Sequence, residues 1–427
     1  MKAIIAHAHA RRIWDSRGRP TIEVELTTAA GHVGRAIAPA GASTGSGEAV
    51  DLRDGGAAMG GYDVRGAVKG FEHTVAPALS GRDAADQAGI DALLAELDGT
   101  ADFGRLGGNT AIATSMAAAH LAAAVQGVPL WRYLAGEADP PFLPLPEIQI
   151  FGGGAHAAGR LDVQDFMITA IGAPDYRTAL DWTAEVYRAA GAIMAETGRL
   201  AGVADEGGWW PAFDGNEDAI ATLTRAIEQA GLRPGLDMAI SLDIAASEFG
   251  DRNGYRLARE GRTLSSEDLA DLIAGWTERY PIVAVEDPLG ETDIDGLAAF
   301  TGRVGDRVEV IGDDALVTDA KRIEAAAARR ACNAVLIKPN QIGTLTGARA
   351  ALEAARRHGW GAVVSARSGE SEDVTIVHLA VGWGVPQLKV GSFARSERMA
   401  KWNEGLRVAE SAPCGPALPP RSTFPWG

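Results

Sequence analysis

The chain has 427 residues, enough for about two or three folding units with a sizeable hydrophobic core that needs no disulfide bonds. Hydrophobic residues make up 46% of the sequence and charged residues 22%, which excludes a disordered, collagen-like or coiled-coil chain. Forty Lys and Arg residues against 56 Asp and Glu residues give a formal net charge of −16, which argues against nucleic-acid and membrane partners. Cys332 and Cys414 are too few for a disulfide framework, so we expect a soluble protein of the reducing cytoplasm.

Residues 1–138 are expected to form one α+β domain. The pattern of residues 2–38 predicts an antiparallel sheet, because apolar and polar residues alternate and glycine-containing turns separate the strands. Between about 62 and 135 the pattern becomes helical and rich in alanine. The proline-rich stretch 139–146 is the expected boundary, and the second domain then covers residues 139–427.

In the second domain, short apolar runs alternate with amphipathic segments of helical length. Candidate strands are 148–151, 166–171, 238–242, 282–285, 308–311, 334–337, 362–364 and 387–389. Candidate helices are 176–197, 216–230, 266–278, 319–330, 344–357 and 372–381. Repeated units of strand and then helix predict a parallel sheet, and eight strands in about 285 residues favour a closed α/β barrel of the (β/α)8 type.

Three acidic residues lie at the ends of candidate strands. Asp243 ends AISLD, Glu286 ends VAVE and Asp313 ends VIGD. The C-terminal strand ends of such a barrel meet at one mouth, where three carboxylates would repel one another without a hard cation. Oxygen-only ligation favours Mg²⁺ over zinc or copper. Taken singly, each acid is better explained as a loop or helix-cap residue, but three at equivalent positions favour a metal site.

Two lysines and a further acid extend this pattern. Lys338 ends AVLIK and Lys389 ends PQLK, and burial and neighbouring cations at a barrel mouth would lower the pKa of such a lysine toward neutrality. The alternative role of each lysine is to pair with one of the carboxylates. Glu206, in VADEGGWW, precedes two glycines that permit a tight loop. A base, an acid and a divalent cation predict proton removal next to a carboxylate, with an enolate-like intermediate stabilised by Mg²⁺.

Ten segments resemble enolase (phosphopyruvate hydratase), in the family's order and along nearly the whole chain. They are WDSRGRPTIEVEL (14–26), GASTG (41–45), HAAGRLDVQDFMI (156–168), ADEGG (204–208), LDIAASEF (242–249), VEDPL (285–289), GDD (312–314), IKPNQIGT (337–344), RSGESED (367–373) and FARSERMAKWNE (393–404). The resemblance implies a hydro-lyase that dehydrates 2-phosphoglycerate, or a close analogue, to phosphoenolpyruvate in glycolysis. The implied fold is an N-terminal α+β capping domain on a barrel that begins ββαα.

The resemblance also implies two bound metal ions. By family pattern, Asp243, Glu286 and Asp313 would hold a tightly bound Mg²⁺. Ser43, in the GASTG loop, would be the protein ligand of a second Mg²⁺ that arrives with the substrate phosphate.

The implied catalytic residues surround the carbon atoms that react. Lys338 would remove the C2 proton, Glu206 would assist departure of the C3 hydroxyl, and Asp165 would be a second acid near that hydroxyl. The implied substrate-binding residues are His156 and Gln164, which close over the ligand, Arg367 and Ser368, which hold its phosphate, and Lys389, which pairs with its carboxylate. The expected partner is therefore a small anionic phosphorylated substrate, and family practice predicts a homodimer or a higher homo-oligomer formed through the N-terminal domain.

Several positions depart from the family pattern. Ala366 stands where the family usually has His, and the second acid is Asp165 rather than Glu. Ala40, Gly152 and the pair Trp209–Trp210 replace the usual Ser, Asn and Phe-Ala. The protein is then either an enolase that tolerates these changes or a specialised paralogue for a bulkier analogue, such as a carboxyphosphonoenolpyruvate synthase of phosphinate antibiotic biosynthesis. A non-catalytic binding protein is a third alternative, against which the retained base, acid and metal carboxylates argue.

Overall fold

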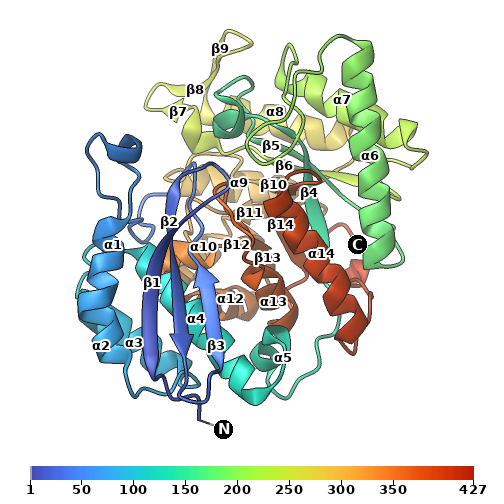
Figure 1. Cartoon of the computed structure of the whole chain (residues 1–427). Helices are drawn as coiled ribbons and strands as arrows, with labels where there is room; N and C mark the ends of the chain where they lie inside the picture. The colour runs from blue at the N-terminus through green and yellow to red at the C-terminus, as the bar shows by residue number, and fades with distance from the viewer. Residues whose placement is uncertain (1) are drawn as a thin grey trace.

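The computed structural model describes residues 2–427, and an antiparallel sheet comes first in the chain (Figure 1). Strands β1 (His7–Trp14), β2 (Pro20–Thr27) and β3 (Val33–Ile37) pair in that order, as predicted. The buried helix α4 (Gly108–Gln126) packs against β2 and β3. Gly34 permits this contact, since a Cβ there would lie 2.2 Å from the backbone nitrogen of Leu121 on α4. The other helices of this part are α1 (Arg65–Gly70), α2 (Ala76–Leu79), α3 (Gln87–Asp98) and α5 (Leu130–Ala135).

Eight strands close into a barrel, and all eight were predicted from the sequence. In chain order they are β4 (Leu145–Gly152), β5 (Asp165–Thr169), β6 (Ala239–Asp243), β10 (Ile282–Glu286), β11 (Glu309–Gly312), β12 (Ala334–Ile337), β13 (Gly361–Ser365) and β14 (Gln387–Ser392). The strands pair in the circular order β4, β5, β6, β10, β11, β12, β13, β14. The fold class is therefore confirmed, whereas the division into domains at residues 138 and 139 stays a prediction.

The barrel begins ββαα, because β5 runs antiparallel to both of its neighbours, β4 and β6. Helices α6 (Tyr176–Glu196) and α7 (Asn216–Gln229) follow β5 before the chain enters β6. The later helices are α8 (Ser266–Arg279), α9 (Ile294–Val304), α10 (Ala320–Arg329), the short α11 (Pro339–Ile342), α12 (Leu345–Arg357), α13 (Thr375–Gly382) and α14 (Ser396–Ser411). Figure 1 shows α6 and α14 on the outside of the barrel, on the side away from the N-terminal sheet.

Helices α9, α11 and α14 and one small sheet were not predicted. Helix α9 contains Gly296 and Gly302, which weaken a helical pattern. Helix α14 buries Arg398 and Lys401 completely, so its inner face does not read as apolar. A small sheet of β7 (Gly250–Asp251), β8 (Gly254–Leu257) and β9 (Arg262–Leu264) is too short for a clear alternation. Among residues 2–427, no helix has both the length and the apolar character needed to cross a membrane.

A layer of polar side chains lies buried within the barrel. This inner polar layer consists of Glu147, Ser241, Glu309 and Gln387. Gln387 Nε2 donates to Glu309 Oε2 at 2.9 Å, and the Ser241 hydroxyl donates to Glu147. Burial raises the pKa of Glu309 to about 8 and also raises the pKa of Glu147. The carboxyl groups of this layer are thus stabilised in their neutral form.

Candidate active site

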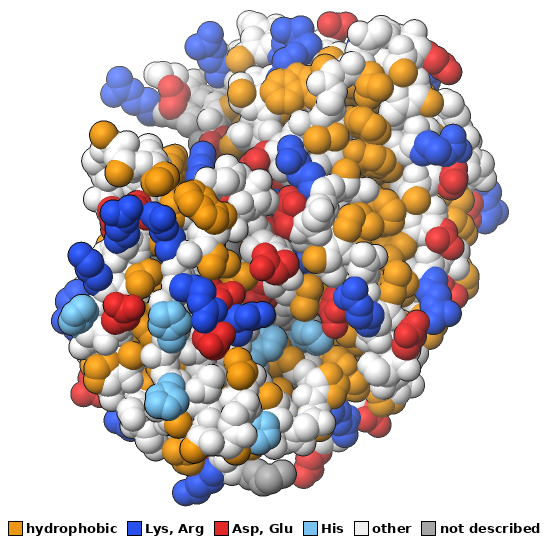
Figure 2. All heavy atoms as spheres, in the orientation of Figure 1, with side chains coloured by type: hydrophobic (Ala, Val, Ile, Leu, Met, Phe, Trp, Pro, Cys, Tyr) orange, Lys and Arg blue, Asp and Glu red, His pale blue; other side chains and the backbone are white. Residues whose placement is uncertain are grey.

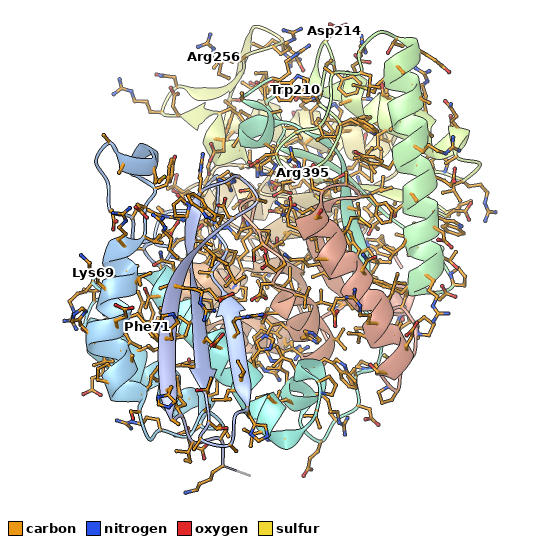
Figure 3. The ribbon with its side chains drawn as sticks, in the orientation of Figure 1. Lys69, Phe71, Trp210, Asp214, Arg256 and Arg395 are labelled. Carbon is orange, nitrogen blue, oxygen red and sulfur yellow. The ribbon has the colours of Figure 1, made fainter. Side chains whose placement is uncertain are left out.

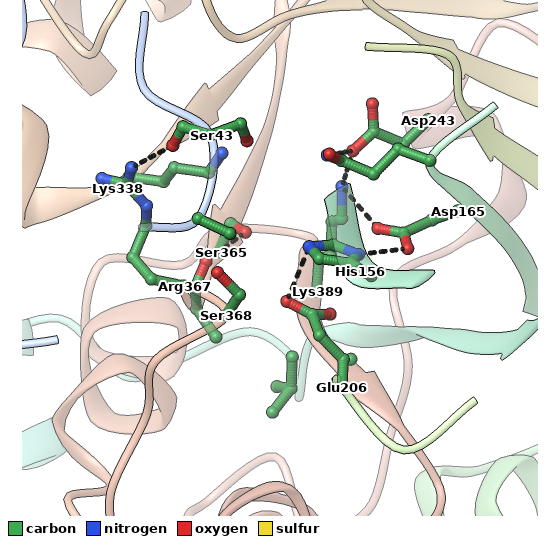
Figure 4. A pocket seen from close by; sticks show the side chains of 15 residues that line it. Ser43, His156, Asp165, Glu206, Asp243, Lys338, Ser365, Arg367, Ser368 and Lys389 are labelled. Carbon is green, nitrogen blue, oxygen red and sulfur yellow. Dashed lines mark hydrogen bonds and ion pairs between the residues drawn. The ribbon is translucent and has the colours of Figure 1, made fainter. Parts of the chain in front are cut away.

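A small polar pocket lies at the mouth of the barrel (Figure 4). Every predicted site residue except Glu286 and Asp313 lines it: Ser43, His156, Gln164, Asp165, Glu206, Asp243, Lys338, Arg367, Ser368 and Lys389. Glu286 and Asp313 touch the pocket residues Lys389 and Lys338 instead. The structure thus brings together residues that are more than 300 positions apart in the sequence.

Strand register explains how the carboxylates reach this mouth. Asp243 is the last residue of β6 and Glu286 the last of β10, and the two are paired across these parallel strands. Asp165 is the first residue of β5, and because β5 runs in reverse it also lies beside Asp243. Asp313 follows the end of β11, the strand next to β10. Four neighbouring strands therefore each supply one acid.

The Lys389 ammonium group holds three of these acids. Its Nζ donates to Glu286 Oε2 at 2.6 Å and Asp243 Oδ2 at 2.8 Å, and it lies 3.8 Å from Asp165 Oδ2. Burial would lower the pKa of Lys389, but the carboxylates around it, Asp243 first, raise that pKa well above its ordinary value. Lys389 lies inside β14 rather than at its end, since the strand continues to Ser392 after an irregularity beyond Lys389.

Lys338 pairs with the fourth acid, Asp313, which also accepts from Gln341 Nε2 at 2.9 Å. The expectation that the pKa of Lys338 is lowered toward neutrality is wrong for this state of the site. Burial lowers this pKa, as expected, but the Asp313 and Glu286 carboxylates outweigh burial and the net shift is upward. Lys338 and Lys389 both pair with carboxylates at the mouth, which was the alternative role considered for them from the sequence.

The acidic groups at the mouth could hold a metal ion. Ligand atoms of Asp287, Asp313 and Asp314 lie within 4.8 Å of one another, as do those of His156, Asp165 and Glu206. Asp243 and Glu286 belong to neither group, and Lys389 Nζ donates to both of them. Glu286 Oε1 is buried without a hydrogen-bond partner, so an oxygen atom is free to bind a hard cation.

Asp287 was not predicted from the sequence, although it follows Glu286 directly in VEDPL. Its carboxylate accepts the backbone N–H groups of Asp313 at 2.9 Å and Asp314 at 2.8 Å. It has a φ of +42°, an unusual conformation for a residue other than glycine. Asp287 therefore fixes the backbone that carries Asp313.

His156 stands between two acids on the side of the pocket opposite Lys338 (Figure 4). Its Nδ1 lies 2.9 Å from Asp165 Oδ1 and its Nε2 lies 3.6 Å from Glu206 Oε1. Burial alone would lower the pKa of His156, but these two carboxylates raise it to about 9. Conversely, although burial raises the pKa of Asp165, His156 and Lys389 lower it to about 2. The histidine is consequently a cation at neutral pH.

On the other side of the pocket, Arg367 is the principal cation besides Lys338 (Figure 4). Its Nη2 donates to the Ser43 carbonyl at 3.0 Å, and Ser368 lies beside it. The pocket therefore has cations on both sides, Arg367 and Lys338 on one and His156 and Lys389 on the other, where carboxylates surround them. Such an arrangement suits a small ligand with two anionic ends.

Buried cations that were not predicted brace the loop of Arg367 and Ser368. Arg398 is fully buried and its Nη1 donates to the carbonyls of Arg367 and Val390, each at 2.7 Å. Lys401 Nζ pairs with Glu370 Oε2 at 2.9 Å, and Arg17 donates to the Ser368 hydroxyl. All three lie in segments that carry the resemblance to the family. From the sequence alone, however, Arg and Lys are expected at the surface, so their buried roles were not predicted.

The departures from the family pattern differ in where they lie. Ala366 does line the pocket. Trp209 does not: its ring stacks on Tyr187 of α6, with ring centroids 4.7 Å apart. Trp210 lies in the loop between α6 and α7, also outside the pocket lining (Figure 3). At Gly152 a Cβ would lie 2.8 Å from Ala204 Cβ, so little room exists for a side chain.

A closed barrel with an acidic and cationic mouth defines an enzyme that acts on a small anionic ligand. The family model for the enolase N-terminal domain matches residues 5–134, and that for the enolase C-terminal TIM barrel domain matches residues 141–414. Enolase 1 of Desulfitobacterium hafniense (strain Y51) is 45% identical over 423 residues, which cover 98% of this chain and 97% of that protein. The chain belongs to the enolase family and is a hydro-lyase.

Proposed function

We propose that the protein dehydrates 2-phosphoglycerate to phosphoenolpyruvate. The observation that carries this proposal is the placement of Lys338 and Glu206 on opposite sides of one small pocket (Figure 4). A base and an acid on opposite faces of a ligand suit the removal of a proton from one carbon and of a hydroxyl group from the next.

In this proposal Lys338, in its neutral form, accepts the C2 proton. The electron pair of the C2–H bond ends as the C2–C3 double bond, and Glu206 donates a proton to the departing C3 hydroxyl, which leaves as water. Asp165 contacts one ring nitrogen of His156, and the other ring nitrogen lies next to Glu206. In this way the two residues position Glu206 beside the departing hydroxyl. Arg367 and Ser368 hold the phosphate, and Gln164 and Lys389 hold the carboxylate end.

The reaction is proposed to need Mg²⁺, with two ions in each site. Asp243, Glu286 and Asp313 would hold one ion, which fits their oxygen-only donors and the unpartnered Glu286 Oε1. Ser43 would contribute to the second. When bound, Mg²⁺ supplies positive charge that stabilises the enolate-like intermediate.

The specialised-paralogue and binding-protein alternatives receive no support from the comparisons, since the relative is called an enolase. Ala366 is the departure that keeps the first alternative testable, because it lines the pocket. The reaction would belong to glycolysis in the cytoplasm, and Cys332 and Cys414, which are both free, fit a reducing compartment.

A homodimer or higher homo-oligomer is also proposed, formed through the open face of β1–β3. Charged and histidine side chains gather over this sheet in Figure 2. Arg11 pairs with Glu23 and Glu25 there, and Trp14 is 51% exposed at the end of β1. Light scattering coupled to size exclusion tests this proposal: a monomer at micromolar concentration would contradict it.

The test of the activity is direct. Purified protein with 2-phosphoglycerate and Mg²⁺ is expected to produce an enol that absorbs in the ultraviolet. Robust turnover supports the proposal, whereas no turnover with this substrate but turnover of a bulkier phosphorylated analogue would favour the specialised paralogue.

A further inference from the structure

Glu48 is a buried carboxylate to which the reaction described above gives no role. It follows the GASTG loop and lies next to Arg367, with their side chains 8% and 3% exposed. Arg367 Nη1 donates to Glu48 Oε2 at 2.9 Å and Arg367 Nη2 to Glu48 Oε1 at 3.3 Å. Two contacts to one carboxylate fix the plane of a guanidinium group as well as its charge.

Glu48 contacts Arg367 from outside the pocket. Arg367 lines the pocket and Glu48 does not. Ser43 and Asn340 also accept from the Arg367 guanidinium, at 3.0 Å and 3.2 Å. Among these partners Glu48 is the only full negative charge, so it contributes most to holding the buried cation in place.

The same carboxylate reaches two further parts of the site. Gly45 N donates to Glu48 Oε1 at 2.9 Å, which ties down the loop of Ser43. Gln341 Nε2 lies 3.3 Å from Glu48 Oε1 and also donates to Asp313 Oδ1 at 2.9 Å. One side chain thus joins the loop of Ser43, Arg367 and the support of Asp313.

We propose that Glu48 is a positioning residue that orients Arg367 for an anionic phosphate group in the pocket. That the phosphate belongs to 2-phosphoglycerate rests on the proposed function. Two other roles predict different results. If Glu48 competed with the phosphate for Arg367, its removal would strengthen binding; if it only held the loop, it would act like any other loop contact.

Glu291 provides a matched control for the loop. Its Oε2 accepts from Ser46 N at 2.8 Å, so it holds the residue directly after GASTG through a backbone N–H. It does not line the pocket. Glu291→Gln therefore reports what loosening the loop does by itself.

The first experiment compares steady-state kinetics of Glu48→Gln, Glu48→Asp and Glu291→Gln with wild type. Glu48→Gln is expected to raise KM for 2-phosphoglycerate about tenfold with a smaller change in kcat, since one charge-assisted pair to the arginine is lost. Glu48→Asp keeps the charge but is one methylene shorter, so its KM is expected to lie between those of wild type and Glu48→Gln. The KM of Glu291→Gln is expected to stay near that of wild type. A lowered KM in Glu48→Gln would show that Glu48 competes with the phosphate for Arg367. Equal effects of Glu48→Gln and Glu291→Gln would show that Glu48 only holds the loop. Either result overturns the proposal.

The second experiment measures the binding of inorganic phosphate by calorimetry, which needs no turnover. Glu48→Gln is expected to weaken phosphate binding about tenfold relative to both wild type and Glu291→Gln. Unchanged affinity, or no phosphate binding by wild type, would overturn the role of Glu48. If wild type binds phosphate but does not turn over 2-phosphoglycerate, the proposed function fails while this arm still decides the role of Glu48.

Discussion

The mouth of the barrel and the inner polar layer both bury carboxyl groups, but they treat the charge differently. Asp165 at the mouth and Glu309 in the inner layer are each 1% exposed. Despite burial, His156 and Lys389 lower the pKa of Asp165 to about 2, whereas burial beside the neutral Gln387 raises the pKa of Glu309 to about 8. The difference lies in the neighbouring cations, because desolvation acts on both groups. Neighbouring cations, more than burial, therefore distinguish the carboxyl groups at the mouth from those of the inner polar layer.

The largest expected effect is the loss of all activity when metal is removed or Asp243→Asn is made. The carboxylates at the mouth are the proposed ligands of Mg²⁺. Without the bound ion, the positive charge that would stabilise the enolate-like intermediate is missing. Turnover of 2-phosphoglycerate is measured with Mg²⁺, with EDTA and after Mg²⁺ is restored. Glu309→Gln, from the inner layer, is the control and is expected to remain active. Full activity in metal-free buffer would refute the metal site.

Lys338→Ala is expected to reduce turnover about 10²–10⁴-fold, the usual contribution of a general base. It should also stop exchange of the C2 proton with solvent, followed by NMR in D2O. Glu206→Gln should slow elimination yet leave some exchange, since the acid acts on the other side of the intermediate. Normal proton exchange in the Lys338 variant would mean that another residue is the base.

Glu309→Gln is expected to stabilise the protein at alkaline pH. Because the folded-state pKa of about 8 lies above the ordinary value of 4.5, Glu309 favours folding below pH 4.5, and this contribution is lost as the pH rises to 8. The variant should gain about 4 kcal/mol over wild type at pH 8.5 and less than about 1 kcal/mol at pH 5. Urea unfolding at the two pH values measures this difference. The same gain at both would show that Glu309 is not the titrating group.

His156 provides the corresponding test at the mouth. With a folded-state pKa of about 9 against 6.5, its stabilising contribution is complete below pH 6.5 and lost as the pH rises through 9. The loss is expected to reach about 3 kcal/mol, and His156→Gln should abolish this part of the pH dependence. Unfolding free energies between pH 6 and 10 check it. An unchanged slope in the variant would contradict the ion pairing of His156 with Asp165.

The smallest expected effect is that of Ala366→His. In an enolase that lacks only one hydrogen-bonding partner, the new imidazole should raise kcat/KM for 2-phosphoglycerate by up to about tenfold. In a pocket adapted to a bulkier substrate, the imidazole would fill needed space and lower the rate instead. Kinetics of wild type and variant on 2-phosphoglycerate distinguish the two.

The sequence was sufficient to predict the barrel and the acids at the ends of its parallel strands. Asp243, Glu286 and Asp313 each follow an apolar run, so alternation and strand order alone bring them to one mouth. Gln164 precedes β5 and Asp165 is its first residue, and only the resemblance indicated them. They lie at the mouth because β5 runs antiparallel to its neighbours. The direction of a strand cannot be predicted from its local pattern of apolar residues.

Contacts between distant segments could not be predicted in the same way. Glu48 and Arg367 are 319 residues apart, and Arg398 of helix α14 donates to the carbonyl of Arg367 in the loop after β13. Each is an ordinary charged residue in its own segment, and its role depends on burial by the rest of the fold. The pKa of Lys338 was mispredicted for a related reason, since the balance between burial and a neighbouring carboxylate is set by distances that sequence does not contain.

The reversed strand β5 also makes part of the site modular. A chain that leaves β4 at the mouth and enters β5 at the mouth never visits the opposite end of the barrel in between. His156, Gln164 and Asp165 therefore belong to one uninterrupted segment, residues 153–165, which contains a short 3-10 helix (Gly154–Ala157) but no α-helix. Exchange of this single segment between family members would transfer all three proposed substrate-site residues at once while leaving every α-helix of the barrel in place.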